Sequence, residues 1–154
     1  MTLREELQTE QVQHLNLTDF SRVTSDTTIG AAIAGMRAEH HHTCLVLSAN
    51  KLVGIVTERD ILRKVIGGDN LHQLVTSIMT PDPITVTPDF PAADALWLMD
   101  RKGIRNLPVV DVTGKIVGNM THKCILDYLA ARYPTVVLNR PPAPDLVAST
   151  PEGG

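Results

Sequence analysis

The 154-residue chain is 43% hydrophobic and 20% charged, and its formal net charge is −3. These values are ordinary for a small globular protein. The basic residues are scattered, whereas polyanion binders gather positive charge on one face, so we expect no nucleic-acid partner. No segment has the apolar run of a signal peptide or of a membrane span, and we expect a cytoplasmic protein with no membrane partner.

The N-terminal extension, residues 1–19, is predicted to begin with a helix. Thr2 and Glu5 have the spacing of a capping box, in which each side chain accepts a hydrogen bond from the backbone of the other. Leu3 and Leu7 follow on one helical face. This apolar face predicts that the helix covers another part of the protein or a partner.

The rest of the chain repeats itself, which is the first feature to establish because it decides the fold. A shift of 63 positions superimposes residues 23–26 on residues 86–89. The apolar spacing i, i+3, i+4, i+7 of an amphipathic helix follows in both copies. We expect Asp26 and Asp89, just ahead of these helices, to cap them. The matched apolar positions are Ile29, Ala32, Ile33 and Met36 in the first copy, and Ala92, Ala95, Leu96 and Met99 in the second.

Each helix leads into two apolar runs joined by a few turn residues, the pattern of a β-hairpin. The runs are residues 44–47 and 52–56 in the first copy, and 107–110 and 115–120 in the second. A further helix follows each hairpin. The sequence therefore predicts an α/β (α+β) protein with two β-α-β-β-α units.

These patterns divide the chain into five segments. Residues 20–68 form the first repeat, residues 69–83 a proline-containing linker, and residues 84–132 the second repeat. The extension at residues 1–19 precedes them. The proline-rich tail, residues 133–154, is predicted to be disordered.

Three segments resemble the hallmark sequences of cystathionine β-synthase (CBS) domains. They are residues 54–62, residues 79–86 and residues 104–111, and the resemblance covers about residues 20–132. It implies tandem repeats packed through their sheets about a pseudo-twofold axis, which is a CBS pair or Bateman module. It also implies an adenosyl ligand (AMP, ADP, ATP or S-adenosylmethionine) and a homodimer of such pairs.

Thr57 and Asp60 carry the candidate ligand chemistry of the first repeat. Thr57 ends a strand and Asp60 begins a helix, where free N–H groups and partial positive charge are available. A carboxylate there can accept hydrogen bonds from both hydroxyls of a ribose, which is the role that the resemblance gives to Asp60. The same two residues also fit a plain helix N-cap, and both interpretations stay open.

Further ligand contacts are expected around this pair. The resemblance implies that adenine lies against the strand that enters the second repeat, while arginine is the side chain best suited to a phosphate. Arg59 and Arg105 also fit a surface role. The expected contacts are Asp82, Pro83 and Ile84 for adenine, Val46 and Ile55 as walls, and His42, Thr43, Arg59 and Arg105 near the phosphate.

The second repeat departs from this pattern because Cys124 stands where Asp60 stands in the first. A thiol is a weak hydrogen-bond acceptor and carries no charge unless it is deprotonated. We therefore predict one competent cleft per chain, at Asp60, and one degenerate cleft near Cys124. Thr121, Lys123 and Arg105 are left there as candidates for a phosphate.

Residues 40–42 are three histidines close to Cys44, and they raise the alternative of a metal site. Adjacent residues on a strand point to opposite faces, however, so such a run converges poorly on one ion. No catalytic motif is present, and we expect neither an enzyme nor a cofactor. Trp97 lies off the apolar stripe of its helix and indicates core or dimer packing.

Three hypotheses follow. The first is a regulatory module that senses energy or metabolite state by binding an adenine nucleotide and acts on an unidentified protein. The second is a dimerisation or protein-interaction module without a small ligand. The third is a metal-binding role at the histidine and cysteine cluster.

Overall fold

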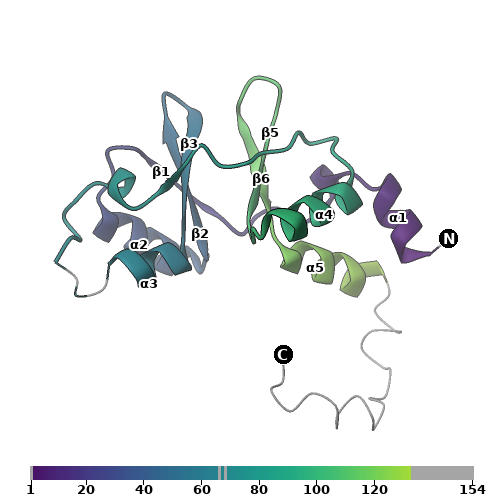
Figure 1. Ribbon diagram of the computed structural model, residues 1–154, viewed down its shortest axis with the longest axis horizontal. Helices are drawn as coiled ribbons and strands as arrows, with labels where there is room; N and C mark the ends of the chain where they lie inside the picture. The colour runs from purple at the N-terminus through teal and green to yellow at the C-terminus, as the bar shows by residue number, and fades with distance from the viewer. Residues whose placement is uncertain (1, 66, 68, 133–154) are drawn as a thin grey trace, which may run out of the picture.

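Two copies of a strand, helix, hairpin and helix stand side by side in the computed structural model, which describes residues 2–65, 67 and 69–132 (Figure 1). The predicted mixed α and β fold is confirmed. The tail at residues 133–154 lies outside the described residues. In chain order the elements are α1 (Leu3–Thr9), η1 (Val12–His14), β1 (Ser21–Thr24), α2 (Ile29–Glu39), β2 (Thr43–Ser48), β3 (Lys51–Thr57), α3 (Glu58–Lys64), η2 (Val75–Ser77), β4 (Thr80–Pro81), α4 (Ala92–Lys102), β5 (Leu107–Val110), β6 (Ile116–Met120) and α5 (His122–Arg132).

The first repeat builds a sheet in the order β1-β2-β3-β4, in which β1 runs parallel to β2 and the other pairs are antiparallel. The predicted hairpin turns at Ala49 and Asn50, with φ of 51° and 63°. Positive φ at both central residues matches the twist of the flanking strands. The turn therefore fixes the pairing of β2 with β3.

In the second repeat the strand expected before α4 is reduced to a single parallel bridge between Val86 and Val109. Its counterpart β1 pairs over four residues, from Ser21 to Thr24. Pro83 and Pro88 flank Val86, and a proline has no N–H to donate to a strand ladder. The two copies therefore differ most at their first strands.

The helix caps also differ from the expectation. The hydroxyl of Thr28, not Asp26, caps α2 by accepting the N–H of Ala31 at 3.2 Å. Asp26 and Asp89 accept hydrogen bonds from threonine hydroxyls two residues earlier instead. The chain needs two more residues after each aspartate to enter the helix, so their carboxylates stabilise the preceding turn.

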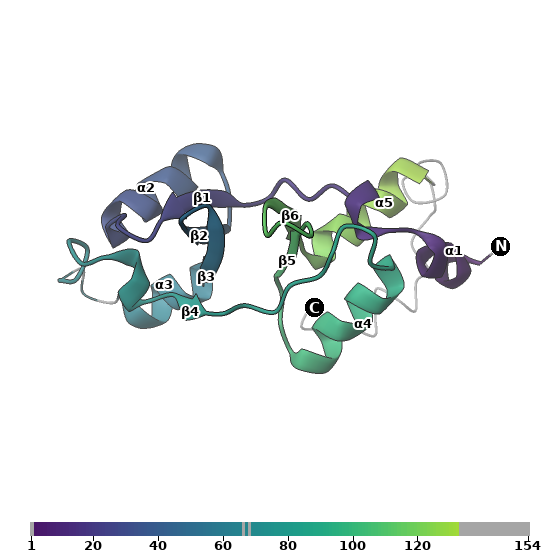
Figure 2. The same cartoon turned by 90° about the horizontal axis from the view of Figure 1, so that it is seen from above.

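The N-terminal extension directly precedes the first repeat in the chain, but it packs on the second repeat. The predicted capping box of Thr2 and Glu5 is confirmed, and α1 packs against α4. Conversely, β4 joins the sheet of the first repeat. Figure 2 shows the two connecting segments, before β1 and after β4, crossing the molecule in opposite directions. Each repeat is thus completed by a segment that precedes the other.

Side chains from both sheets meet in an apolar cluster between the repeats. Leu45 and Ile55 of the first sheet pack with Ile116 of the second, and Phe20 and Val110 border them. Each repeat has its own larger core beneath its helices. Trp97 is 61% exposed, so the expectation that it packs in the core is wrong. Over the described residues, no helix is both long and apolar enough to span a membrane.

Gly118 and Gly54 are equivalent positions in the two hairpins, and each contacts a connecting segment. Gly118 contacts Leu17 in the segment before β1, and Gly54 contacts Met79 next to β4. A Cβ at Gly118 would collide with Leu17 Cβ and lie 2.9 Å from the Leu17 backbone oxygen. A Cβ at Gly54 would meet only the side chain of Met79, with Cγ at 2.9 Å. A flexible methionine can move aside more easily than a backbone carbonyl.

Gly118→Ala is therefore expected to lower the free energy of unfolding by about 2–3 kcal/mol, and Gly54→Ala by less. Gly35→Ala is the matched control, because nothing lies within 4 Å of its added Cβ in α2. It is expected to stabilise the protein by about 0.5–1 kcal/mol. Urea unfolding of the three variants measures this order, and an equal loss at Gly54 and Gly118 would contradict it.

Candidate functional site

A cleft of about 810 Å³ opens between the two repeats and is lined by both. The first repeat contributes the strand-to-helix junction of β3 and α3, and the second contributes the loop before β5 and the start of α5. Nine of the predicted ligand residues line it: His42, Thr43, Ile55, Thr57, Arg59, Asp60, Arg105, Thr121 and Lys123. The structure therefore brings to one hollow residues as far apart in the sequence as His42 and Lys123, which are separated by 81 positions (123 − 42).

Thr57 and Asp60 form a capping box at the start of α3. The carboxylate Oδ2 accepts the Thr57 N–H at 2.9 Å and the Thr57 hydroxyl at 3.1 Å, while the Asp60 N–H donates to Thr57 Oγ1 at 3.3 Å. The structural role that the sequence allowed is thus present. Oδ1 faces only Lys64 Nζ, at 3.9 Å. One carboxylate oxygen is held by the helix cap, and the other is left as an acceptor.

Thr121 and Cys124 reproduce this junction in the second repeat with sulfur in place of the carboxylate. Cys124 Sγ accepts the Thr121 N–H at 3.3 Å and donates to the Asn16 carbonyl at 2.9 Å. The thiol is buried and does not line the cleft. Thr121 and Lys123 line the same hollow as Asp60, so they do not form the separate degenerate cleft that was expected around Cys124.

Four other predicted residues lie away from this cleft. Val46 is fully buried on the opposite face of β2, in the core with Ile29, because neighbours on a strand alternate sides. It is therefore no wall of the cleft. Ile84 is 41% exposed, and the Asp82 N–H donates to the Val53 carbonyl at 3.1 Å, which holds this stretch at the sheet edge. Asp82, Pro83 and Ile84 therefore do not line the cleft.

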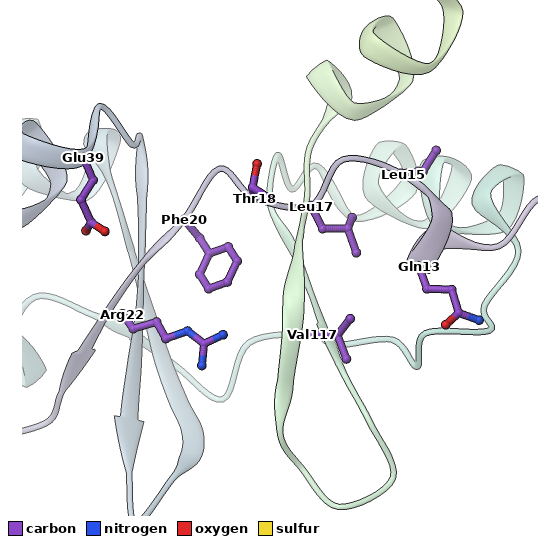
Figure 3. Close-up of a pocket in the computed structure, with 8 residues that line it drawn as sticks. All are labelled: Gln13, Leu15, Leu17, Thr18, Phe20, Arg22, Glu39 and Val117. Atoms are coloured by element: carbon purple, nitrogen blue, oxygen red, sulfur yellow. The ribbon is translucent and has the colours of Figure 1, made fainter. Parts of the chain in front are cut away.

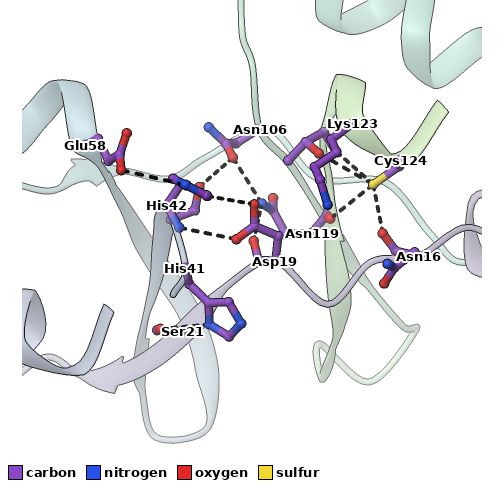
Figure 4. A network of polar contacts seen from close by, with 12 residues as sticks. Asn16, Asp19, Ser21, His41, His42, Glu58, Asn106, Asn119, Lys123 and Cys124 are labelled. Atoms are coloured by element: carbon purple, nitrogen blue, oxygen red, sulfur yellow. Dashed lines mark hydrogen bonds and ion pairs between the residues drawn. The ribbon is translucent and has the colours of Figure 1, made fainter. Parts of the chain in front are cut away.

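His42 sits between two carboxylates at the cleft (Figure 4). Its backbone N–H donates to Asp19 Oδ1 at 3.2 Å, and its ring Nδ1 lies 3.2 Å from Asp19 Oδ2. Its Nε2 lies 4.0 Å from Glu58 Oε1. Asp19 precedes β1, so this contact ties the connecting segment to the start of β2 and to the first turn of α3.

The neighbouring histidine and cysteine side chains diverge, which removes the basis of the metal hypothesis. The ring of His41 contacts Ser21 Oγ at 3.1 Å, whereas Cys44 is buried in the core of the first repeat. Burial, with a smaller effect from Glu39, raises the pKa of the Cys44 thiol to about 12 and keeps it neutral. No group of three or more metal-ligating side chains occurs within residues 2–65, 67 and 69–132.

A partly buried chain of polar side chains joins the repeats at the cleft, which Thr43 and Asn106 both line. The Thr43 hydroxyl donates to Asn106 Oδ1 at 2.6 Å, and the Asn119 amide donates to the same oxygen at 3.0 Å and to the Asp19 carbonyl at 3.3 Å (Figure 4). Thr43 and Asn119 are 2% and 0% exposed. Among the described residues, the bond from Thr43 to Asn106 is the only hydrogen bond between a side chain of the first repeat, residues 20–68, and a side chain of the second, residues 84–132.

Asp19, Asn106 and Asn119 were not predicted as site residues from the sequence, although the repeat contains a signal for Asn106. The 63-residue shift superimposes Thr43 on Asn106, so the hydrogen bond joins two equivalent positions. Two residues related by a pseudo-twofold axis meet only where they lie next to that axis. Asn119 gave no such signal, because its counterpart in the first repeat is the apolar Ile55.

A second hollow, of about 570 Å³, lies at the outer edges of β1 and β6 and contains none of the predicted site residues. Figure 3 shows Phe20 and Arg22 on one side and Val117 on the other. The Arg22 guanidinium lies 5.3 Å from the Phe20 ring centroid. The Arg22 guanidinium is therefore already in contact with an aromatic ring. The larger cleft between the repeats remains the candidate site.

The two halves of the chain match one known family. Residues 12–67 and residues 75–131 each match the CBS domain. The chain belongs to the CBS-domain family. Each match begins at a short 3₁₀ turn, η1 or η2, and therefore includes the connecting segment that packs on the opposite repeat. The chain is thus a CBS pair.

Relatives of this CBS pair include proteins of unlike length. Uncharacterized protein MK0525 of Methanopyrus kandleri is 39% identical over 114 residues, which are 70% of this chain and 58% of that protein. An inosine-5′-monophosphate dehydrogenase of Korarchaeum cryptofilum is 44% identical over 78 residues, 51% of this chain and 16% of that protein. The chain spans less than two thirds of both relatives, so their whole-protein activities do not follow from the match.

Solved structures show the same fold. The CBS domain pair of protein MJ0100, in complex with 5′-methylthioadenosine and S-adenosyl-L-methionine, superimposes with a TM-score of 0.70 at 23% identity, covering 80% of this chain and 98% of that one. CBSX2 in complex with AMP gives a TM-score of 0.67 at 26% identity, covering 79% and 97%. The tandem CBS architecture is therefore confirmed.

The hydrogen bond between Thr43 and Asn106 is expected to contribute to the free energy of unfolding. Asn106→Ala is expected to lower the free energy of unfolding by about 2 kcal/mol, because it leaves the Thr43 hydroxyl unpaired. Thr43→Val, of similar shape, is expected to cost about 1 kcal/mol. The double variant should cost less than the two together by about 1 kcal/mol, as measured by urea unfolding. Strict additivity would show that the bond contributes nothing.

Proposed function

We propose that this CBS pair is a regulatory module, not an enzyme, which binds an adenosyl ligand in the cleft between its repeats. The observation that carries the proposal is Asp60 Oδ1, an acceptor left free by the helix cap and placed in a cleft of about 810 Å³. That volume lies in the range of small-molecule sites. The complex of CBSX2 with AMP supports the choice of ligand class.

The ribose would be held by Asp60, whose charged oxygen accepts hydrogen bonds from the vicinal hydroxyls. Thr57 lies beside it, although its hydroxyl already donates to Asp60. For adenine, the apolar residues that line the cleft are Ile55, Leu62 and Ile104. They replace Ile84 and Val46 as the apolar contacts of the base.

A regulatory effect of the ligand would follow from the fact that both repeats line the cleft. A ligand that contacts both repeats stabilises their present arrangement by mass action, since it binds only the folded protein. Helices α3 and α5 begin at the cleft and expose their far ends to solvent. A change in the spacing of the repeats would move these helices, and with them the surface offered to a regulated protein.

Calorimetric titration with AMP, ADP, ATP and S-adenosylmethionine tests the proposal, and Asp60→Asn separates its two roles. Asparagine keeps an oxygen for the helix cap but loses the charge, so we expect affinity to fall at least about tenfold with little loss of stability. Asp111→Asn, in the exposed turn between β5 and β6, is the matched control and should bind like wild type. Absence of binding to any of the four compounds, or equal binding by Asp60→Asn, would refute the proposal.

A dimerisation module without a small ligand is the second candidate, favoured by the exposure of large apolar side chains. Leu62 and Leu126 occupy equivalent places on α3 and α5 and are 71% and 64% exposed. Trp97 on α4 is 61% exposed. Side chains of this size and exposure are typical of surfaces that meet another protein chain.

Light scattering after gel filtration tests whether a second copy covers this surface. We expect a dimer for the wild type and a monomer for Leu126→Glu, because a buried unpaired carboxylate opposes association. Val112→Glu is the control, since Val112 is 95% exposed in a hairpin turn and should leave the dimer intact. A wild-type monomer at all concentrations would exclude homodimerisation.

A further inference from the structure

A hollow of about 420 Å³, the hairpin-tip hollow, lies between the turns of the two hairpins, at the opposite end of β3 from the candidate cleft. Figure 1 shows both hairpin turns pointing the same way, away from α3 and α5. The apolar residues that line it include Ile116, a member of the cluster between the repeats, and Leu47, which packs against that cluster. Among the described residues, none lines both this hollow and the cleft.

Two lysines line the hairpin-tip hollow from opposite repeats. Lys51 begins β3 and Lys115 directly precedes β6, and a shift of 64 positions (115 − 51) superimposes them as equivalent residues. Residues related by a pseudo-twofold axis come together only next to that axis. The stem of Lys51 also lies against the second hairpin, because its Cγ is 3.9 Å from the position that a Cβ on Gly114 would take. The duplication therefore places two lysine side chains at one hollow.

Arg22 of β1 adds a third cation to the same hollow. Its neighbour Val23 packs against the core of the first repeat, and successive residues of a strand point to opposite faces. The Arg22 side chain therefore lies on the other face, where its guanidinium is 5.3 Å from the ring centroid of Phe20. Stacking uses the flat face of a guanidinium, and the N–H groups around its edge can still donate hydrogen bonds.

No carboxylate lines the hairpin-tip hollow within residues 2–65, 67 and 69–132, where Lys51, Lys115 and Arg22 also form no ion pair. The nearby Asp111 Oδ1 accepts the Thr113 hydroxyl at 2.6 Å and the N–H groups of Thr113 and Lys115 at 2.9 and 3.0 Å. The hydroxyl bond is the largest cause that lowers the pKa of Asp111, and the charge of Lys115 is the smallest. Like charges that gather without a counterion repel one another, so the hollow favours an anion from solution.

We propose that the hairpin-tip hollow is a second binding site, which takes a compact polyvalent oxyanion, such as diphosphate, between Lys51, Lys115 and Arg22. Ammonium and guanidinium groups both donate charge-assisted hydrogen bonds to phosphate oxygens. A volume of about 420 Å³ suits a small molecule. The anion joins the two hairpins at the end opposite the cleft and stabilises the packing of the repeats. This site does not depend on the proposed function of the cleft.

Titration of the isotopically labelled full-length chain with inorganic diphosphate, followed by amide chemical shifts in low salt with EDTA, tests the site. We expect saturable binding of one diphosphate per chain, with shift changes at residues 49–51 and 113–115. Added salt should weaken binding, because both partners are exposed charges. Shift changes confined to residues 57–60 and 121–123, at the cleft, would overturn the proposal.

Lys51→Gln and Lys115→Gln identify the cations. Each is expected to weaken diphosphate binding at least about fivefold, whereas Lys51→Arg should stay within about twofold of wild type. Lys102→Gln is the matched control, because it removes the same charge at the end of α4, away from both the hollow and the cleft. An equal loss in Lys102→Gln would overturn the site, since the effect would then be one of net charge.

Thermal unfolding checks the folding of the variants and gives a second measurement. Without diphosphate, all variants should melt close to the wild type. Diphosphate should raise the melting temperature of the wild type by mass action, and it should leave the double variant of Lys51→Gln and Lys115→Gln unchanged. An equal rise in the double variant would contradict the proposal.

An acidic segment of a partner protein is the other occupant that three cations would attract. A hexaglutamate peptide that binds the hollow more tightly than diphosphate does would overturn the small anion and assign the surface to such a partner. Absence of saturable diphosphate binding would overturn it as well. Neither result bears on the adenosyl ligand of the cleft, which the calorimetric titration tests separately.

Discussion

The arrangement of this CBS pair depends on the contact between its halves, where the hydrogen bond from the buried Thr43 to the half-buried Asn106 accompanies the apolar cluster of Leu45, Ile55 and Ile116. Apolar contacts bring the sheets together but are tolerant of sliding, because burial has no preferred direction. A buried hydrogen bond does have a direction, and losing it leaves a polar group unpaired. The bond therefore fixes which residues of the second repeat face the junction of β3 and α3.

The two equivalent strand-to-helix junctions differ most in the side chain that accepts the threonine N–H, which is Asp60 in the first repeat and Cys124 in the second. At Asp60 the helix cap uses one oxygen and leaves a second, charged one for a ligand. At Cys124 the single sulfur accepts from Thr121 and donates to Asn16, so nothing remains to bind with. The cap survives in both copies because it needs only one acceptor. The ribose contact proposed above needs a further acceptor, which Asp60 has in the first copy and Cys124 does not have in the second.

Each connecting segment packs on the repeat that does not follow it in the chain, and these contacts join the two small repeats into one folded domain. The segment at residues 12–19 packs on the second repeat, while β4 pairs with β3 of the first. Neither repeat has its complete core without a segment that precedes the other. At Gly118 and Gly54 these segments lie against the hairpins so closely that an added Cβ would contact Leu17 or Met79.

Periodicity and turn chemistry are local, so the sequence alone determined the helices, the hairpins, the duplication and the capping pair at Thr57 and Asp60. Alternation along a strand also follows from local geometry, but which face meets the other repeat does not, and Val46 was placed on the wrong one. Only the tertiary structure decided that Thr121 and Lys123 share a cleft with Asp60, that Ile84 does not line it, and that Asp19, Asn106 and Asn119 link the halves. Those relations join residues far apart in the chain, and they depend on how two surfaces pack, which no local pattern records.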